Sequence, residues 1–159
     1  SWLFQKSVDA IEVVIHRESV IHSMVEYADG SCIAQLGVPD MQIPIQYAMT
    51  YPNRVPSGVK PLSLADYGQL TFYRPDLETF SCLRVCMDAL RMGGLYPCAA
   101  NAANEEAVAL FREEKIRFLQ IGELVEKAAF AQRMPLEYTL EDVFWAEREA
   151  RRFVREHGR

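Results

Sequence analysis

One stretch constrains the fold of this chain more than any other. In residues 15–41, two apolar runs rich in β-branched side chains flank the dipeptide Asp29-Gly30. An Asp-Gly pair between two such runs is a strong signal for a β-hairpin, because glycine adopts a positive φ without steric cost. The second run ends at Gly37, which interrupts a strand and begins a loop. We therefore predict an antiparallel hairpin with strands at residues 19–27 and 31–36.

Helical signals follow the hairpin. Asp40 is a suitable N-cap for a helix that ends at Tyr51-Pro52, and apolar residues on both of its faces predict a helix sandwiched between two layers. Residues 8–15 are rich in β-branched side chains and predict a buried strand. Residues 53–61 are rich in turn formers and read as a linker, so we place a domain boundary there.

Beyond this linker the chain takes on the pattern of amphipathic helices. Ser81 is expected to cap a helix that stops at Gly93-Gly94, and Thr139 with Asp142 forms a capping box before the last helix. Two further apolar stripes lie between them. One comprises Ala103, Ala107, Leu110 and Phe111, and the other Ile121, Leu124, Val125, Ala128 and Ala129. Four such helices with short connections predict a four-helix bundle, and hence an α+β chain.

Composition excludes several classes of function. The net charge is −5, which argues against a nucleic-acid surface, and no apolar run approaches the roughly 18 residues of a membrane span. None of the four cysteines forms a C-x-x-C pair, so we expect buried thiols rather than a disulfide or a metal site. His16 and Glu18 superficially match the H-x-E of zinc deaminases, but Asn101 stands where the second cysteine of their P-C-x-x-C would be, which excludes that site.

The polar residues of the hairpin allow more than one interpretation. Ser19 with His16 or His22 could act as a nucleophile and its base, but no G-x-S-x-G elbow accompanies them, which disfavours a hydrolase. Strand alternation places His22 on a face with Val20 and Met24, as expected for a hydrogen-bonded core histidine. The sequence contains no G-x-G-x-x-G and no glycine-rich phosphate loop. From the residues alone, the chemistry stays open.

The amino-acid sequence of the hairpin resembles that of a known enzyme family. The runs Ile21-His22-Ser23-Met24-Val25, Asp29-Gly30-Ser31 and residues 34–41 (Ala-Gln-Leu-Gly-Val-Pro-Asp-Met) are similar to 1-deoxy-D-xylulose 5-phosphate reductoisomerase. The resemblance continues through Pro52-Asn53-Arg54 and Asn101-Ala102-Ala103-Asn104-Glu105 and covers nearly the whole chain. One departure is Arg17-Glu18, where the family has Pro-Gln.

The resemblance implies a particular fold and cofactor set. Residues 1–60 would be the end of a central catalytic α/β domain plus a linker, with residues 1–6 the tail of a helix, and residues 61–159 the C-terminal helical domain. The family uses NADPH and Mg or Mn to convert 1-deoxy-D-xylulose 5-phosphate to 2-C-methyl-D-erythritol 4-phosphate in non-mevalonate isoprenoid biosynthesis. The NADPH, metal and phosphate motifs would precede this chain, which is therefore expected to be inactive alone and to contain no metal ligand.

The resemblance also suggests site residues and partners. His22 and Ser19 match catalytic positions, and Pro39 and Met41 match the loop that packs beside the nicotinamide. The family implies a homodimer, a sugar phosphate substrate, no nucleic-acid or membrane partner, and a location in the bacterial cytoplasm or a plastid. Two alternatives remain: a non-catalytic helical interaction or dimerisation module, and a paralogous oxidoreductase with another substrate.

Overall fold

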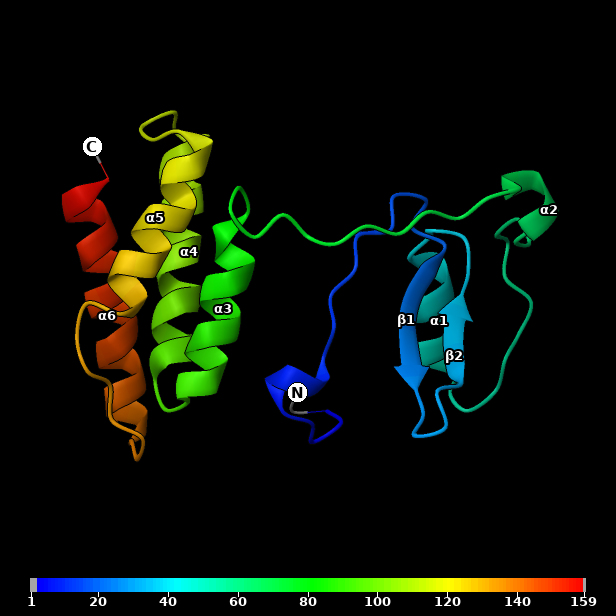
Figure 1. The fold of residues 1–159 in the computed structure, drawn as a ribbon, viewed down its shortest axis with the longest axis horizontal. Coiled ribbons are helices and arrows are strands. Elements are labelled where there is room, and N and C mark those ends of the chain that lie inside the picture. The colour runs from blue at the N-terminus through cyan, green and yellow to red at the C-terminus, as the bar shows by residue number, and fades with distance from the viewer. Residues whose placement is uncertain (1–2, 159) are drawn as a thin grey trace. The chain divides into compact units, whose positions relative to one another are not determined.

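The computed structural model describes residues 3–158, which form two compact units (Figure 1). One unit comprises residues 13–74 and is called here the hairpin unit. The other, called the helical unit, comprises residues 75–158 together with residues 3–12. The units meet in sequence at residues 12 and 13 and at residues 74 and 75. The predicted domain division after residue 60 stays a prediction.

The hairpin unit contains the expected antiparallel pair, β1 (Ile21–Glu26) and β2 (Cys32–Leu36). The turn between them confirms the Asp-Gly signal. Gly30 has a φ of 82° and donates its N–H to the Tyr27 carbonyl, while the Asp29 carboxylate accepts from Ser31. The pairing passes from Ile21 opposite Leu36 directly to Ser23 opposite Gln35, so His22 is the extra residue of a β-bulge.

Helix α1 (Gln42–Thr50) differs from the prediction in its surroundings. It was expected between two layers, yet none of its residues is buried, and Ile45 and Met49 are 54% and 82% exposed. No second layer exists among residues 13–74 to cover them. Asp40 contributes to the helix start by accepting the Gln42 N–H at 2.8 Å, although Met41 occupies the N-cap. A short helix, α2 (Leu64–Tyr67), follows the predicted linker.

The predicted strand at residues 8–15 is wrong. Residues Val8–Ala10 form a 3₁₀ turn, and only Ile15 pairs, through a single bridge to Tyr73 with N···O distances of 2.8 and 2.9 Å. An isolated bridge results because no further strand within the described residues continues the ladder. Residues 3–5 form a turn rather than the end of a helix, and residues 1 and 2 lie outside the described part of the chain.

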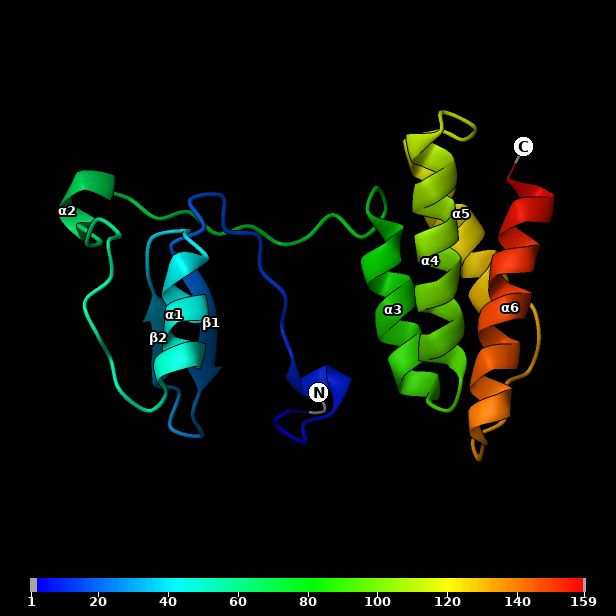
Figure 2. The ribbon, with the colours of Figure 1, turned by 180° about the vertical axis from the view of Figure 1, so that it is seen from behind.

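The helical unit is the predicted bundle of α3 (Ser81–Met92), α4 (Tyr96–Arg112), α5 (Phe118–Ala129) and α6 (Leu140–His157). Figures 1 and 2 show these helices side by side, and α4 packs against the other three. Close approach is possible because small residues line the contact surfaces of α4. These buried residues are Ala99, Ala100, Ala102, Ala103 and Ala107.

Most of the helix signals are confirmed, with local corrections. All five residues predicted to point inward from α5 are buried, and the Thr139–Asp142 capping box is formed. Phe80 rather than Ser81 is the N-cap of α3. The expectation of buried thiols is wrong for Cys32 and Cys86, which are exposed, and Cys82 and Cys98 are partly buried. Within residues 3–158, no helix combines the length and apolarity needed to cross a membrane.

Candidate functional site

The hairpin unit contains a cavity of about 530 Å³ at the start of β1, beside the loop that leads into α1. Ser19, His22, Pro39 and Met41 all line it, so the structure brings the four predicted site residues together. Its volume lies within the range of small-molecule sites. This clustering gives the candidate site a definite location, while the role of each residue stays a prediction.

The β-bulge determines where His22 lies. The extra residue breaks the alternation of faces, so the prediction of a buried core histidine is wrong: His22 is exposed and lines the cavity. Its Nδ1 lies 3.1 Å from Oε1 of Gln35, whose Nε2 donates to the Leu36 carbonyl. The Gln35 amide is thereby oriented so that its Oε1 accepts from His22 Nδ1, which leaves His22 Nε2 outside this hydrogen bond.

Ser19 is held in an unusual backbone conformation. Its φ is 50°, in the left-handed region, and its N–H donates to the His16 carbonyl at 3.3 Å. The next residue, Val20, is wholly buried and donates its N–H to His16 Nε2 at 3.1 Å. Strain of about 1 kcal/mol or more at such a residue persists only where its neighbours fix it. The His16 ring provides that constraint, because its Nε2 accepts the Val20 N–H.

A second layer of contacts fixes His16 in turn. Because His16 Nε2 accepts from Val20, its Nδ1 carries the proton, and it lies 2.9 Å from the Thr71 carbonyl and 3.0 Å from the Glu18 carboxylate. Glu18 accepts the Thr71 hydroxyl at 2.7 Å and the Thr71 N–H at 3.2 Å. The Thr71 hydroxyl is the main reason why the pKa of Glu18 lies below its ordinary value.

Arg17-Glu18, where the resembled family has Pro-Gln, therefore lies among the contacts that join residues 16–18 to Thr71. Besides the Glu18 contacts, the Arg17 guanidinium lies over the Tyr73 ring at 5.0 Å from its centroid. The His16 ring stacks on Phe72 at 4.7 Å. Three consecutive residues of the hairpin entry thus contact residues 71–73, more than fifty positions away in sequence. Arg17 and Glu18 join the hairpin entry to the end of the unit.

One wall of the cavity is apolar. It is formed by Val38, Pro39 and Met41 of the loop and by Ile43 and Pro44 of the first turn of α1. Asp40 lies among them, but its Oδ1 is engaged by the Gln42 N–H. An apolar wall opposite a histidine suits a ligand with a flat, weakly polar group and excludes water from it.

Among the eight other residues that line the cavity, the sequence interpretation missed three with polar side chains: Gln35, Tyr47 and Arg54. Gln35 orients His22 across the strand pair, and Arg54 lies over the Tyr47 ring with Cζ 3.9 Å from the centroid. The strand register pairs Gln35 with Ser23, and its contact with His22 depends on the bulge, which the sequence does not mark. Arg54 lies in the predicted linker, and no sequence signal connected it to the hairpin.

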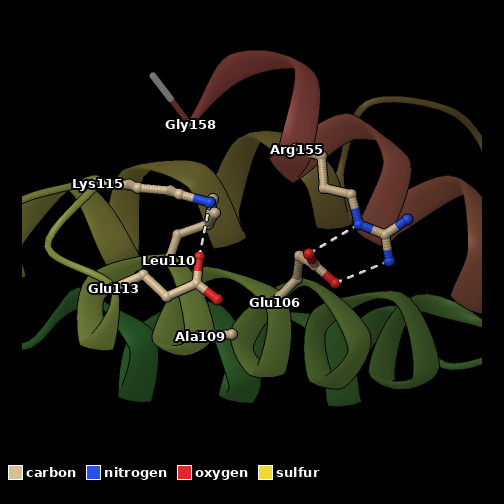
Figure 3. Close-up of a pocket in the computed structure, with 7 residues that line it drawn as sticks. All are labelled: Glu106, Ala109, Leu110, Glu113, Lys115, Arg155 and Gly158. Carbon is tan, nitrogen blue, oxygen red and sulfur yellow. Dashed lines mark hydrogen bonds and ion pairs between the residues drawn. The ribbon is translucent and has the colours of Figure 1, made fainter.

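A second cavity, of about 440 Å³, lies in the helical unit between α4 and the end of α6 (Figure 3). Its charged residues already neutralise one another. Arg155 donates two hydrogen bonds to Glu106, and Lys115 pairs with Glu113 at 2.7 Å. Because these charges have protein partners, this cavity is a poor candidate for a charged ligand. Among residues 3–158, no cluster of three or more His, Cys, Asp or Glu side chains could hold a metal ion.

A hairpin unit with a small-molecule cavity, followed by a four-helix bundle, defines the chain as an α+β protein with a candidate ligand site. The family model described as DXP reductoisomerase C-terminal domain matches residues 36–153. The chain belongs to this family, as the sequence resemblance predicted.

Curated relatives extend the match over the hairpin. The 1-deoxy-D-xylulose 5-phosphate reductoisomerase of Acetivibrio thermocellus is 50% identical over 155 residues, which is 98% of this chain and 41% of that protein. The enzyme of the same name from Gloeobacter violaceus is 50% identical over 154 residues, or 97% of this chain and 39% of the relative. The chain thus spans about two-fifths of the length of the curated relatives it matches.

Solved structures of enzymes of the same name are also similar to this chain. The reductoisomerase of Zymomonas mobilis in complex with NADPH has a TM-score of 0.89 and 41% identity, covering 98% of this chain and 41% of that one. A DOX-P reductoisomerase structure with fosmidomycin and magnesium has a TM-score of 0.87 and 39% identity, with the same coverage. The similarity therefore includes the hairpin unit with its cavity as well as the bundle.

Proposed function

We propose that this chain is the C-terminal part of an NADPH-dependent reductoisomerase that converts 1-deoxy-D-xylulose 5-phosphate to 2-C-methyl-D-erythritol 4-phosphate. The observation that carries the proposal is the cavity in which Ser19, His22, Pro39 and Met41 meet. Relatives of that name cover 98% of the chain, and one solved relative holds NADPH. Residues 1–60 would complete the catalytic domain and residues 61–159 would form the helical domain.

The cavity residues fit such a role by their chemistry. Pro39 and Met41 offer an apolar surface of the kind that excludes water beside a nicotinamide ring. His22, with Nδ1 donating to Gln35, can hold or accept a proton at Nε2, and the Ser19 hydroxyl can hydrogen-bond a substrate oxygen. When bound, NADPH supplies a hydride and a divalent cation polarises the substrate oxygens.

Residues outside this chain would provide the rest of the site. We propose that Mg or Mn and the substrate phosphate are held there. On its own, the chain should then be inactive. Exposed apolar residues on both faces of the hairpin also favour a larger protein: Met24 is 46% exposed and Val25 49%. We further propose a homodimer with the Ser31–Leu36 edge at the contact, in the bacterial cytoplasm or a plastid.

The test is a turnover assay on the complete polypeptide that carries these residues. It should oxidise NADPH only when 1-deoxy-D-xylulose 5-phosphate and a divalent cation are present. His22→Ala should lower kcat by about 10²–10⁴-fold, the usual contribution of a positioned proton-transfer group. The matched control is His157→Ala, another exposed histidine, which lies on α6 and hydrogen-bonds to the Phe153 carbonyl. Equal effects of the two variants, or no turnover by the complete polypeptide, would refute the proposal.

A further inference from the structure

We propose that Arg54 adds a contact from this chain to a phosphate group of the ligand that occupies the hairpin-unit cavity, beside the phosphate motifs that would precede the chain. The inference rests on the proposed function, in which both ligands, NADPH and the sugar phosphate, carry phosphate. It adds to that function a residue of the segment 53–61, which was predicted to be a linker and is not part of the apolar wall.

The first argument is that the charge of Arg54 is not neutralised. Among residues 3–158, its guanidinium has no hydrogen-bond or ion-pair partner, although it lines the cavity. Arginines of the bundle behave differently, since Arg84, Arg151 and Arg155 all pair with carboxylates. The contact that Arg54 does make, over the face of Tyr47, uses the π surface of the guanidinium and leaves its N–H donors available.

The second argument is that the structure holds Arg54 in place. Gln46 of α1 donates to the carbonyls of Val55 and Pro56 at 2.9 and 3.1 Å, and the Thr50 hydroxyl donates to the Asn53 carbonyl at 2.9 Å. The residues on both sides of Arg54 are therefore anchored to the same helix that forms the cavity wall. A preorganised cation loses less entropy when it binds an anion than a freely moving side chain does.

The ring beneath Arg54 is also fixed. Tyr47 packs edge-on against Tyr51, with 5.7 Å between the ring centroids, so the surface on which the guanidinium rests has its own support. A planar guanidinium with free donors recognises phosphate through two parallel hydrogen bonds. The cavity thus offers an apolar wall, a histidine and a fixed cation, which together suit a ligand with a flat group and a phosphate.

The lining of the cavity carries one carboxylate besides the Arg54 cation. The other charged residue lining the cavity, Asp40, has its Oδ1 engaged by the Gln42 N–H. The net charge of −5 repels an anion at long range, so the Arg54 guanidinium is the cationic group of the lining that can attract a phosphate.

The experiment compares Arg54→Gln, Arg54→Lys and a control in the complete polypeptide. The control, Arg74→Gln, removes a cation from the same unit that does not line this cavity. KM is measured separately for NADPH and for the sugar phosphate. Arg54→Gln should raise one of these KM values at least about tenfold with kcat changed less than about threefold, and Arg54→Lys should give an intermediate value because it keeps the charge but loses the fork.

Which KM rises identifies the source of the phosphate. If both KM values of Arg54→Gln match those of Arg74→Gln, the inference is overturned while the proposed function stands. If the complete polypeptide does not turn over, the proposed function fails, and calorimetric titration with NADPH and with the sugar phosphate decides the role of Arg54. Weaker binding of either ligand by Arg54→Gln than by Arg74→Gln would support it, and equal binding would refute it. Circular dichroism of each variant excludes misfolding.

Discussion

In the four-helix bundle, Val85, Val125 and Val154 are wholly buried, together with most of the apolar stripe of each helix. Among residues 13–74, Val20 alone is buried. The hairpin unit is instead stabilised by hydrogen bonds, an ion pair and a few contacts of aromatic rings. Because apolar burial supplies most of the folding free energy, the bundle can stabilise itself, whereas the hairpin unit depends on a small set of specific contacts.

The comparison teaches that stability and candidate function are separated in this chain. The bundle has a continuous core, and its charged cavity residues are already paired. The hairpin unit exposes apolar side chains and holds His22 and Ser19 in a bulge and a left-handed conformation. Strained residues and exposed polar groups are common at ligand sites, where the surroundings must fix them.

The largest expected effect is in the bundle. Gly94 has a φ of 54°, and a Cβ there would lie 2.3 Å from the backbone oxygen of Pro135. Gly94→Ala should therefore lower the free energy of unfolding of the bundle by about 3 kcal/mol, from backbone strain and a clash that side-chain rotation does not relieve. Urea denaturation followed by circular dichroism measures it. Gly58→Ala is the control, since nothing lies within 4 Å of its Cβ position, and a comparable loss there would contradict the account.

Two valine truncations then separate the units. Val20→Ala and Val125→Ala each remove two methyl groups from a wholly buried side chain and should cost about 2 kcal/mol in their own unit. Val20→Ala should abolish the dispersion of the hairpin amide signals in NMR spectra and leave the helical signal unchanged. Val125→Ala should lower the melting temperature of the helices. Loss of helix in Val20→Ala would show that the units do not fold independently.

Substitutions of Glu18 should weaken its hydrogen bonds to Thr71 to different degrees. Glu18→Ala removes the acceptor of the Thr71 hydroxyl and N–H, and faster hydrogen exchange at the Thr71 amide is the expected result. Glu18→Gln, the residue of the family pattern, keeps an acceptor and should retain most of the protection. If the two variants exchange equally fast, the carboxylate-to-Thr71 contacts do not hold this segment.

The smallest expected effect is the response of the bundle to acid. Arg84 lowers the pKa of Glu126, and Arg155 lowers that of Glu106, each through bidentate hydrogen bonds. A carboxyl group whose pKa is lower in the folded state stabilises the fold above its unfolded pKa of about 4.3, and this stabilisation is lost as the pH falls through the folded value.

Each pair should contribute about 1 kcal/mol or less, because the pairs are largely solvated. Glu126→Gln should flatten the stability profile below pH 5, as measured by urea titration at several pH values. An unchanged profile would mean that the Arg84 pair carries no net stability.

The accuracy of the sequence interpretation follows the same division. The α5 stripe and the Thr139–Asp142 capping box were predictable because helix periodicity and capping are local. The strand at residues 8–15 and the covered α1 were not, since both predictions require neighbouring layers that residues 13–74 do not supply.

The candidate site was predictable in part. His22, Ser19, Pro39 and Met41 were identified by resemblance, and the hairpin with its adjoining loop brings them together. The alternation of side chains along the strand placed His22 on the wrong face. A single-residue bulge interrupts that alternation, and it leaves no clear mark in the sequence. Arg54 was missed because only the hydrogen bonds of Gln46 and Thr50 return its segment to α1.

The measurement that tests the central claim most directly is native-state hydrogen exchange on this chain. The account predicts that the amides of α4 and α5 are protected by the full unfolding free energy, whereas those of residues 21–26 and 32–36 exchange with little protection. In the complete polypeptide, the hairpin amides should gain protection and the helical amides should change little. Equal protection of the hairpin and the bundle in this chain alone would contradict the claim that only the bundle stabilises itself.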